Sequence, residues 1–182
     1  MTRIIGGSAG GRRVAVPKGA ATRPTSDRVR EALFNILAAR GLPRGVAVLD
    51  AYAGSGALGL EAASRGATRV VCVESHRATA RLIEANATSL GLTVQVCSMP
   101  VAEYAARPPD PVGLVLADPP YPMSEDDLAR DVAALVDGGH VEPGGLLVIE
   151  RSTRSPQPRW PAGVVAEPVR RYGETALWLG TC

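Results

Sequence analysis

The sequence predicts an α/β fold, a mostly parallel sheet with helices on both faces. The first observation is an alternation: from Val46 onward, short β-branched and apolar runs take turns with longer segments whose apolar residues recur at helical spacing. That rhythm is typical of parallel sheets built from strand–helix–strand units. The second observation is that residues 163–169 and 174–179 are two β-type runs with a short turn between them. They predict an antiparallel hairpin at the edge of the sheet.

The segment before Val46 is expected to form a small extension. Residues 3–5 and 13–16 are short β-type runs joined by a glycine-rich stretch, which indicates a hairpin. A helix should follow, capped by Thr25 or Ser26 and ending near Gly41. The strands expected after this extension are 46–50, 69–74, 93–97, 112–117 and 145–150, and the expected helices are 57–65, 76–90, 101–106 and 125–137. We divide the chain into an N-terminal unit, 1–40, and a main domain, 41–182.

Length and composition favour one globular domain in the cytosol. The chain has 182 residues, enough for one core of ordinary size. No apolar run approaches the ~20 residues of a membrane helix, and the N-terminus lacks the apolar stretch of a signal peptide. Cys72, Cys97 and Cys182 are odd in number and far apart, so we expect neither a disulfide nor a metal site. We expect a monomer.

Charge is distributed unevenly along the chain. Residues 1–45 carry nine basic and two acidic side chains, a balance of +7, so the overall charge of +2 leaves −5 for the remainder. A basic segment on an acidic body is expected where one end of a protein grips phosphate, as in nucleic-acid binding. The alternative is a solvated charged tail with no partner.

A glycine-rich turn after the first main-domain strand indicates a cofactor site. Asp50 ends that strand, and Gly54, Gly56 and Gly59 follow, with amides exposed where the next helix begins. The three glycines also spell the GxGxxG of dinucleotide-binding proteins. However, Asp50 would repel a pyrophosphate and suits the cationic methionine end of S-adenosylmethionine. We therefore predict S-adenosylmethionine. The alternative role for Asp50, and for Glu74 at the end of the second strand, is helix capping or a surface charge.

Two later strand ends should complete the cofactor site. Glu74 ends the second strand, where a carboxylate accepts both ribose hydroxyls in either cofactor class. Met99 or Val101, after the third strand, is expected to cover the adenine, with simple core packing as the alternative.

The fourth strand ends in a motif suited to amine methylation. Asp118, Pro119, Pro120 and Tyr121 follow it directly. The prolines fix the backbone, so that the Asp118 side chain and the Pro119 carbonyl could hold the two N–H groups of an exocyclic amine and turn its lone pair outward. Tyr121 could stack on a base extruded from its helix. An ordinary turn is the alternative interpretation of these residues.

Several motifs together resemble the RsmD family of bacterial 16S ribosomal RNA guanine-N2 methyltransferases, over almost the whole chain. The matching segments are Arg3-Ile4-Ile5-Gly6-Gly7, Gly11-Arg12-Arg13, Arg23-Pro24-Thr25, 27–35, 53–62 and 118–121. The sequence departs from the family at Tyr52, where phenylalanine is common, and at Met99, where no polar side chain is offered.

The resemblance implies a Rossmann-like class I methyltransferase with a seven-stranded sheet, acting on a guanine of 16S ribosomal RNA in the small subunit. It implies that Asp118 to Tyr121 hold the guanine amine. It implies cofactor contacts at Asp50, Tyr52, Gly54, Ser55, Gly56, Glu74, Ser75, Met99, Val101 and Thr25. It implies that RNA is met, or the lid over the cofactor ordered, by Arg12, Arg13, Arg23, Arg28 and Arg30, and we expect Arg3 to meet RNA as well.

Two other functions stay open. The same tetrapeptide serves adenine-N6 and cytosine-N4 methyltransferases of DNA or RNA. The chain could also be a non-catalytic RNA-binding assembly factor that keeps the fold.

Overall fold

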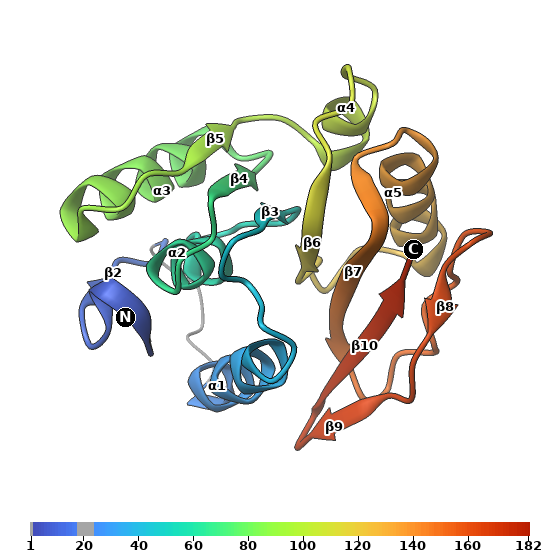
Figure 1. Ribbon diagram of the computed structural model, residues 1–182, viewed down its shortest axis with the longest axis horizontal. Coiled ribbons are helices and arrows are strands. Elements are labelled where there is room, and N and C mark those ends of the chain that lie inside the picture. The colour runs from blue at the N-terminus through green and yellow to red at the C-terminus, as the bar shows by residue number, and fades with distance from the viewer. Residues whose placement is uncertain (1, 18–23) are drawn as a thin grey trace.

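The central sheet of the computed structural model has eight strands, in the order β5-β4-β3-β6-β7-β10-β8, with β9 also paired to β10 (Figure 1). The structure describes residues 2–17 and 24–182. The strands are β1 Thr2–Arg3, β2 Arg13–Val14, β3 Ala47–Asp50, β4 Arg69–Val73, β5 Gln95–Cys97, β6 Val112–Ala117, β7 Val141–Ser152, β8 Val165–Ala166, β9 Arg170–Tyr172 and β10 Thr175–Thr181. The helices are α1 Pro24–Ala38, α2 Ala57–Ser64, α3 Arg77–Leu90, α4 Val101–Ala105 and α5 Glu125–Asp137, with a 3₁₀ turn at Gly7–Ala9.

Strand order reverses between β3 and β6. From β3 the chain builds β4 and β5 on one side, then returns to place β6 and β7 on the other, all parallel. The predicted parallel sheet is confirmed. In open α/β sheets, ligands bind at such a switch point, outside the carboxyl ends of the strands.

The C-terminal strands differ in detail from the prediction. Only Val165–Ala166 (β8) of the expected run 163–169 forms a strand, whereas β9, Arg170–Tyr172, lies in the segment expected to be the turn; both strands pair antiparallel with β10. Pro168 lies between them, and because proline has no amide N–H it cannot donate to a ladder. The sheet therefore has eight strands rather than the seven that the family resemblance implies. β7 also starts earlier than predicted, at Val141, which pairs with Val112 of β6.

Helices cover both faces of the sheet, as predicted. Buried side chains of α1, α2 and α3, including Leu33, Phe34 and Ile83, pack with one set of inward strand residues. Buried side chains of α4 and α5, including Tyr104 and Leu128, pack with the other set. The two apolar clusters lie on opposite faces because successive side chains of a strand alternate.

The start of α1 differs from the prediction. The sequence suggests that Thr25 or Ser26 precedes and caps the helix, but the helix begins at Pro24, so both residues lie in its first turn. Proline is favoured at a helix start because the amide it lacks would have no partner within the helix.

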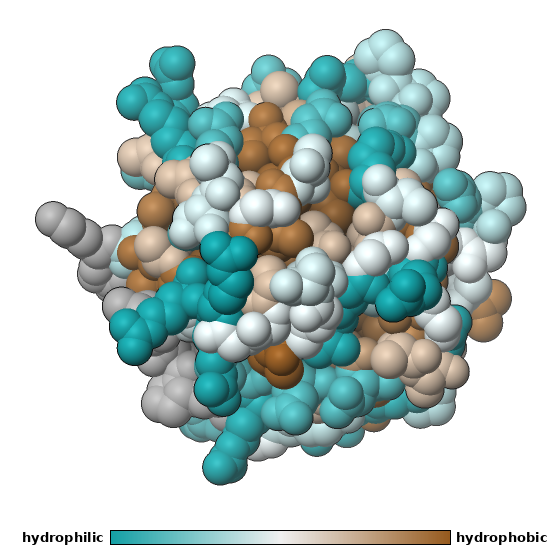
Figure 2. Space-filling model, turned by 60° about the vertical axis from the view of Figure 1, so that its left-hand side comes forward, coloured by the Kyte–Doolittle hydropathy of each residue, from teal (hydrophilic) through white to brown (hydrophobic). Residues whose placement is uncertain are grey.

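The predicted N-terminal hairpin forms and packs against the main domain. β1 pairs antiparallel with β2, with Thr2 opposite Val14. Its apolar residues Ile4, Ala9 and Val14 are buried against α2 and α3. The hairpin is therefore docked through an apolar side and is not a free arm. The face shown in Figure 2, which brings the left side of Figure 1 forward, carries hydrophilic side chains around smaller hydrophobic areas.

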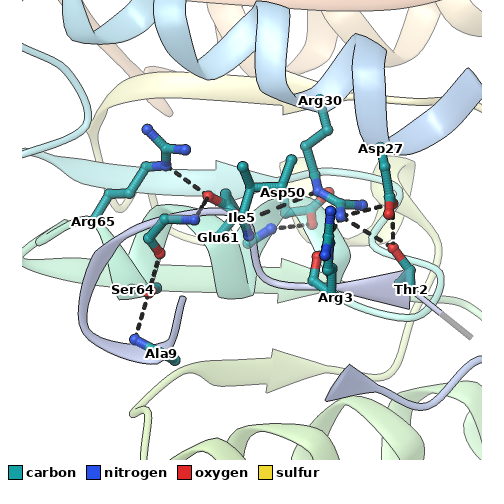
Figure 3. Close-up of polar contacts among 12 residues, drawn as sticks. Thr2, Arg3, Ile5, Ala9, Asp27, Arg30, Asp50, Glu61, Ser64 and Arg65 are labelled. Carbon is teal, nitrogen blue, oxygen red and sulfur yellow. Dashed lines mark hydrogen bonds and ion pairs between the residues drawn. The ribbon is translucent and has the colours of Figure 1, made fainter. Parts of the chain in front are cut away.

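A buried carboxylate fixes this docking (Figure 3). Glu61 of α2 is fully buried and accepts hydrogen bonds from the backbone amides of Ile5, at 2.6 Å, and Gly6, at 2.9 Å. The Nε of Arg65 donates to the same carboxylate at 2.6 Å, and the Nε of Arg30 lies 4.0 Å from it. A buried carboxylate is tolerated only when hydrogen bonds and cations replace the water that it loses.

Prediction one concerns Glu61. Replacement Glu61→Gln keeps the shape but removes the charge that faces two buried or half-buried guanidinium groups, so we expect the free energy of unfolding to fall by about 3 kcal/mol. Urea denaturation followed by circular dichroism measures this change. The matched control is Glu84→Gln, an exposed glutamate on α3, and equal losses in the two variants would contradict the structural role of Glu61.

Candidate active site

The carboxyl ends of β3, β4, β5 and β6 open onto one cavity of about 510 Å³. Register explains their convergence: Asp50, the last residue of β3, pairs with Cys72 of β4 and Leu116 of β6. Parallel strands in this register end at the same edge of the sheet. The predicted site residues that line the cavity are Tyr52, Gly54, Ser55, Glu74, Ser75, Met99, Val101, Asp118 and Pro120.

The turn between β3 and α2 depends on its glycines. Gly54 has φ +53° and Gly56 has φ +82°, in the left-handed region that disfavours other residues. A Cβ built on Gly56 would lie 2.9 Å from Cγ2 of Ile83. Gly56 does not itself line the cavity, so the structure gives it the task of shaping the turn.

Glu74 connects two loops at the edge of the cavity. One carboxylate oxygen accepts from the Gly54 amide at 2.9 Å and the other from the His76 amide at 2.7 Å. A carboxylate oxygen has two acceptor sites, so each oxygen retains capacity for a ligand hydroxyl. These bonds fix the orientation of the side chain before any ligand arrives.

Asp50 lies behind the cavity wall and not on its surface, which corrects the expected direct contact. Its side chain is fully buried, and Oδ2 accepts from the Gly59 amide at 2.8 Å, in the first turn of α2. Oδ1 is buried without a hydrogen-bond partner among the described residues. Burial raises the pKa of the Asp50 carboxyl to about 7; the charges of Asp118 and Glu74 also raise it, and the Gly59 bond opposes the shift.

Asp131 and Met123 also line the cavity, although no pattern in the sequence predicted them there. The Tyr52 hydroxyl donates to Oδ2 of Asp131 at 2.7 Å. Burial and then this bond raise the pKa of Tyr52 well above its ordinary value. Asp131 is one of several acidic residues on α5, and no spacing in the sequence connects it to the strand ends. The packing of α5 against the sheet brings it there.

The charge of the cavity discriminates between the two cofactor classes. Among the described residues that line it, the charged side chains are Glu74, Asp118 and Asp131, and none is basic. Three carboxylates would repel a pyrophosphate, which argues against a dinucleotide. They fit a ligand that carries a sulfonium and an ammonium group, so these residues suit S-adenosylmethionine, and the unpartnered Oδ1 of Asp50 adds a further acceptor behind them.

The motif after β6 separates this cavity from a second, smaller recess. Asp118 lines both hollows. Pro119 is buried, whereas 68% of the Tyr121 side chain is exposed. The Pro120 carbonyl accepts from the Met123 amide at 2.9 Å, which closes the loop toward α5. A carboxylate thus stands between a ligand cavity and a surface hollow flanked by an exposed aromatic ring.

The predicted RNA-binding arginines fall into two groups. Arg3, Arg13 and Arg28 are exposed. Arg30 is only 4% exposed, and its guanidinium donates to Thr2, Asp27 and the Arg3 carbonyl, so its contact with RNA is corrected to a role in holding the hairpin.

Arg12 also has a role within the protein. Its guanidinium donates to the Leu90 carbonyl at 2.6 Å and to the Ser89 carbonyl, at the C-terminal end of α3. Cations are favoured there because the last carbonyls of a helix have no partner within it. Arg23 lies outside the described residues, as does the side chain of Thr25.

Comparison with protein families and curated proteins gives a consistent match. A family model described as "Conserved hypothetical protein 95" matches residues 2–181. The chain is 37% identical to the ribosomal RNA small subunit methyltransferase D of Escherichia coli K12, over 97% of this chain and 88% of that protein. It is 30% identical to the Haemophilus influenzae protein of the same name, over 85% of this chain and 80% of that protein.

Solved structures show the same architecture. An Escherichia coli methyltransferase aligns with a TM-score of 0.86 at 32% identity, covering 98% of this chain and 96% of that one. The Thermus thermophilus 16S rRNA N2 G1207 methyltransferase RsmC, solved with AdoMet and guanosine, aligns with a TM-score of 0.70 over 91% of this chain and 45% of that one. Its identity of 21% indicates a shared fold alone. The predicted class I methyltransferase fold is confirmed.

Prediction two concerns Glu74. In Glu74→Gln, an amide nitrogen replaces a carboxylate oxygen that accepts from a backbone N–H in the native protein, and the negative charge is lost. We therefore expect S-adenosylmethionine to bind ~10- to 100-fold more weakly. Isothermal titration calorimetry measures the dissociation constant. Glu103→Gln, an exposed position on α4, is the control, and equal affinities in the two variants would remove Glu74 from the binding site.

Prediction three concerns pH and Asp50. Its pKa is about 7 in the folded protein against 3.8 for an unperturbed carboxyl. Between these values the folded state keeps a proton that the unfolded chain has released, so rising pH lowers the free energy of unfolding until about pH 7. Asp50→Asn lacks this titration. We therefore expect its stability relative to the native protein to improve by up to about 1.4 kcal/mol per pH unit across that window.

Urea denaturation of both proteins at about pH 5, 6, 7 and 8, without cofactor, tests the pH effect. A stability difference that stays constant from about pH 5 to 7 would contradict the raised pKa. Above about pH 7 we expect the free energies of unfolding of the two proteins to follow parallel curves, separated by a constant difference.

Proposed function

Because the chain belongs to the RsmD family of S-adenosylmethionine-dependent methyltransferases, we propose that it methylates the exocyclic N2 amine of a guanine in 16S ribosomal RNA. The proposed substrate is the small ribosomal subunit in the cytoplasm, and the proposed acting form is a monomer. The relatives named above act, by their names, on small-subunit ribosomal RNA.

The observation that carries this proposal is the position of Asp118 at the boundary of two hollows. The larger hollow has the acidic lining that suits the cofactor, and the smaller one opens beside Tyr121. A base whose edge meets the mouth of the recess would bring its amine to the Asp118 carboxylate, next to the cofactor cavity. Bases are reached in this way only when they are extruded from their stack.

S-adenosylmethionine, when bound, supplies a methyl group on a cationic sulfur. Glu74 would hold the ribose hydroxyls, while Asp131, fixed by Tyr52, adds negative charge to the cavity. Asp118 would accept one N–H of the amine and the Pro119 carbonyl the other, so that the nitrogen lone pair faces the cavity. Positioning of this kind supplies much of the rate enhancement. The methylated nitrogen then releases one proton, which Asp118 or solvent accepts.

The N-terminal unit, 1–40, is proposed to bind RNA. The exposed residues Arg3, Arg12, Arg13 and Arg28 are the described candidates for phosphate contact, and Arg23 is expected to join them. The docked hairpin holds Arg3 and Arg13 in a fixed position relative to the main domain, because Glu61 anchors its backbone. Fixed phosphate contacts set the register of an RNA without reading its sequence.

Prediction four tests the function. Small subunits from a strain that lacks this protein should gain one N2-methylguanine when they are treated with purified protein and S-adenosylmethionine, as mapped by mass spectrometry. Asp118→Ala should lower the methylation rate ~100-fold or more while it retains RNA binding, because only the positioning carboxylate is lost. Asp137→Ala, at the exposed end of α5, is the control.

Other products would point elsewhere. Methyl groups on adenine or cytosine, or on naked DNA, would favour an adenine-N6 or cytosine-N4 enzyme. Unchanged activity in Asp118→Ala would remove the motif from catalysis. Binding to subunits without any methyl transfer by the native protein would favour an assembly factor.

A further inference from the structure

The small recess beside Asp118 contains a second carboxylate, Glu150, that no motif assigns. The recess, of about 30 Å³, is lined by Asp118, Pro119, Tyr121, Glu150, Arg151, Ser152 and Ser155. Ala117 of β6 pairs with Ile149 of β7 in parallel register. The residues that follow them, Asp118 and Glu150, therefore stand side by side at the same edge of the sheet. The two side chains line one hollow although 32 positions separate them in the chain.

The position of Glu150 is fixed from several sides. β7 lies between β6 and β10, and Glu150 itself pairs with Leu177 of β10. Its neighbour Arg151 is 8% exposed, donates to the Met123 carbonyl at 3.4 Å and forms an ion pair with Glu125. Arg151 thus ties the end of β7 to the loop that follows Tyr121. A recognition site needs this rigidity, because its groups must hold their geometry before the ligand arrives.

Acceptors dominate the recess. When ionised, Asp118 and Glu150 act only as acceptors, and among the described residues that line the recess the basic side chain is Arg151, which forms an ion pair with Glu125. The hydroxyls of Ser152 and Ser155 can donate or accept, so they do not discriminate. A ligand edge with two adjacent donors therefore suits the two neighbouring carboxylates.

The Watson–Crick edges of the three amino bases differ at this point. In guanine, the ring nitrogen next to the exocyclic amine, N1, carries a proton, so the amine and N1–H form a row of donors. In adenine and cytosine, the ring nitrogen next to the amine is an unprotonated acceptor. A carboxylate beside the amine site matches the first arrangement and repels the second, and a desolvated polar group without a partner is costly.

We infer that Glu150 is a specificity-determining residue that accepts a hydrogen bond from N1–H of the target guanine, while Asp118 accepts from its N2 amine. The inference rests on the proposed function and deepens it, because it explains why guanine is chosen over adenine or cytosine at a motif that serves all three amines. Tyr121 then stacks on the face of the base, and the two carboxylates read its edge.

Prediction five uses a base analogue that keeps the amine but loses the N1 proton. Small subunits are reconstituted with ribosomal RNA that carries guanine or 2-aminopurine at the mapped methylation position. The native protein should methylate guanine with a kcat/KM ~10- to 100-fold above that for 2-aminopurine. In Glu150→Gln the amide can donate to an unprotonated N1, so the guanine kcat/KM should fall and the preference should shrink by a similar factor.

Two controls isolate the effect of Glu150. Glu142→Gln makes the same substitution at the exposed, opposite end of β7 and should keep the native preference. Calorimetry should show unchanged S-adenosylmethionine affinity in Glu150→Gln, because Glu150 does not line the cofactor cavity.

The outcomes separate the inference from the proposed function. If the native protein transfers no methyl group to guanine in small subunits, the proposed function fails. If it methylates guanine but accepts 2-aminopurine equally well, the proposed recognition of N1–H is overturned, whatever the variants show. If the native preference is present and Glu150→Gln retains it in full, the assignment to Glu150 is overturned.

Discussion

The parallel pairing of β3 with β6 is the constraint on which the whole site depends. It places the glycine turn after Asp50 beside the acidic–proline motif after Ala117, although the intervening chain builds two further strands and three helices. The same edge receives Glu74 from β4 and Glu150 from β7. The roles proposed for Glu74, Asp118 and Glu150 follow from their meeting at this edge. A shift of one residue in the register of β3 against β6 would turn the side chains of the shifted strand to the other face of the sheet.

Helix α2 links the two halves of the molecule through two buried acids. Asp50 holds its first turn through the Gly59 amide, and Glu61 on another part of the same helix holds the hairpin through the Ile5 and Gly6 amides (Figure 3). Burying a carboxylate costs free energy, and both are stabilised by backbone N–H groups. The cofactor turn and the proposed RNA-binding hairpin are thus anchored to one short helix.

Charge is divided between the two parts, but less simply than the composition suggests. The cavity is acidic, as a cationic cofactor requires, while the first 45 residues are strongly basic. Part of that basic charge is used inside the protein. Arg30 forms ion pairs with the buried Glu61 and with the partly exposed Asp27. Arg12 donates to the C-terminal carbonyls of α3. A count of arginines therefore overstates the charge available to RNA, because a count does not distinguish paired from solvent-facing side chains.

The sequence by itself determined the α/β class, the hairpin, the glycine turn, and the strand-end positions of Glu74 and Asp118. These features depend on local patterns: alternating apolar residues, glycines with positive φ and acids that follow a strand directly. Only the tertiary structure decided that Asp50 lies behind the cavity, that Asp131 and Glu150 face ligand hollows, that Arg30 is buried, and that the exposed Arg12 bonds the end of α3. The reason is physical: periodicity shows which face of an element is buried, but the partner across that face comes from a distant part of the chain.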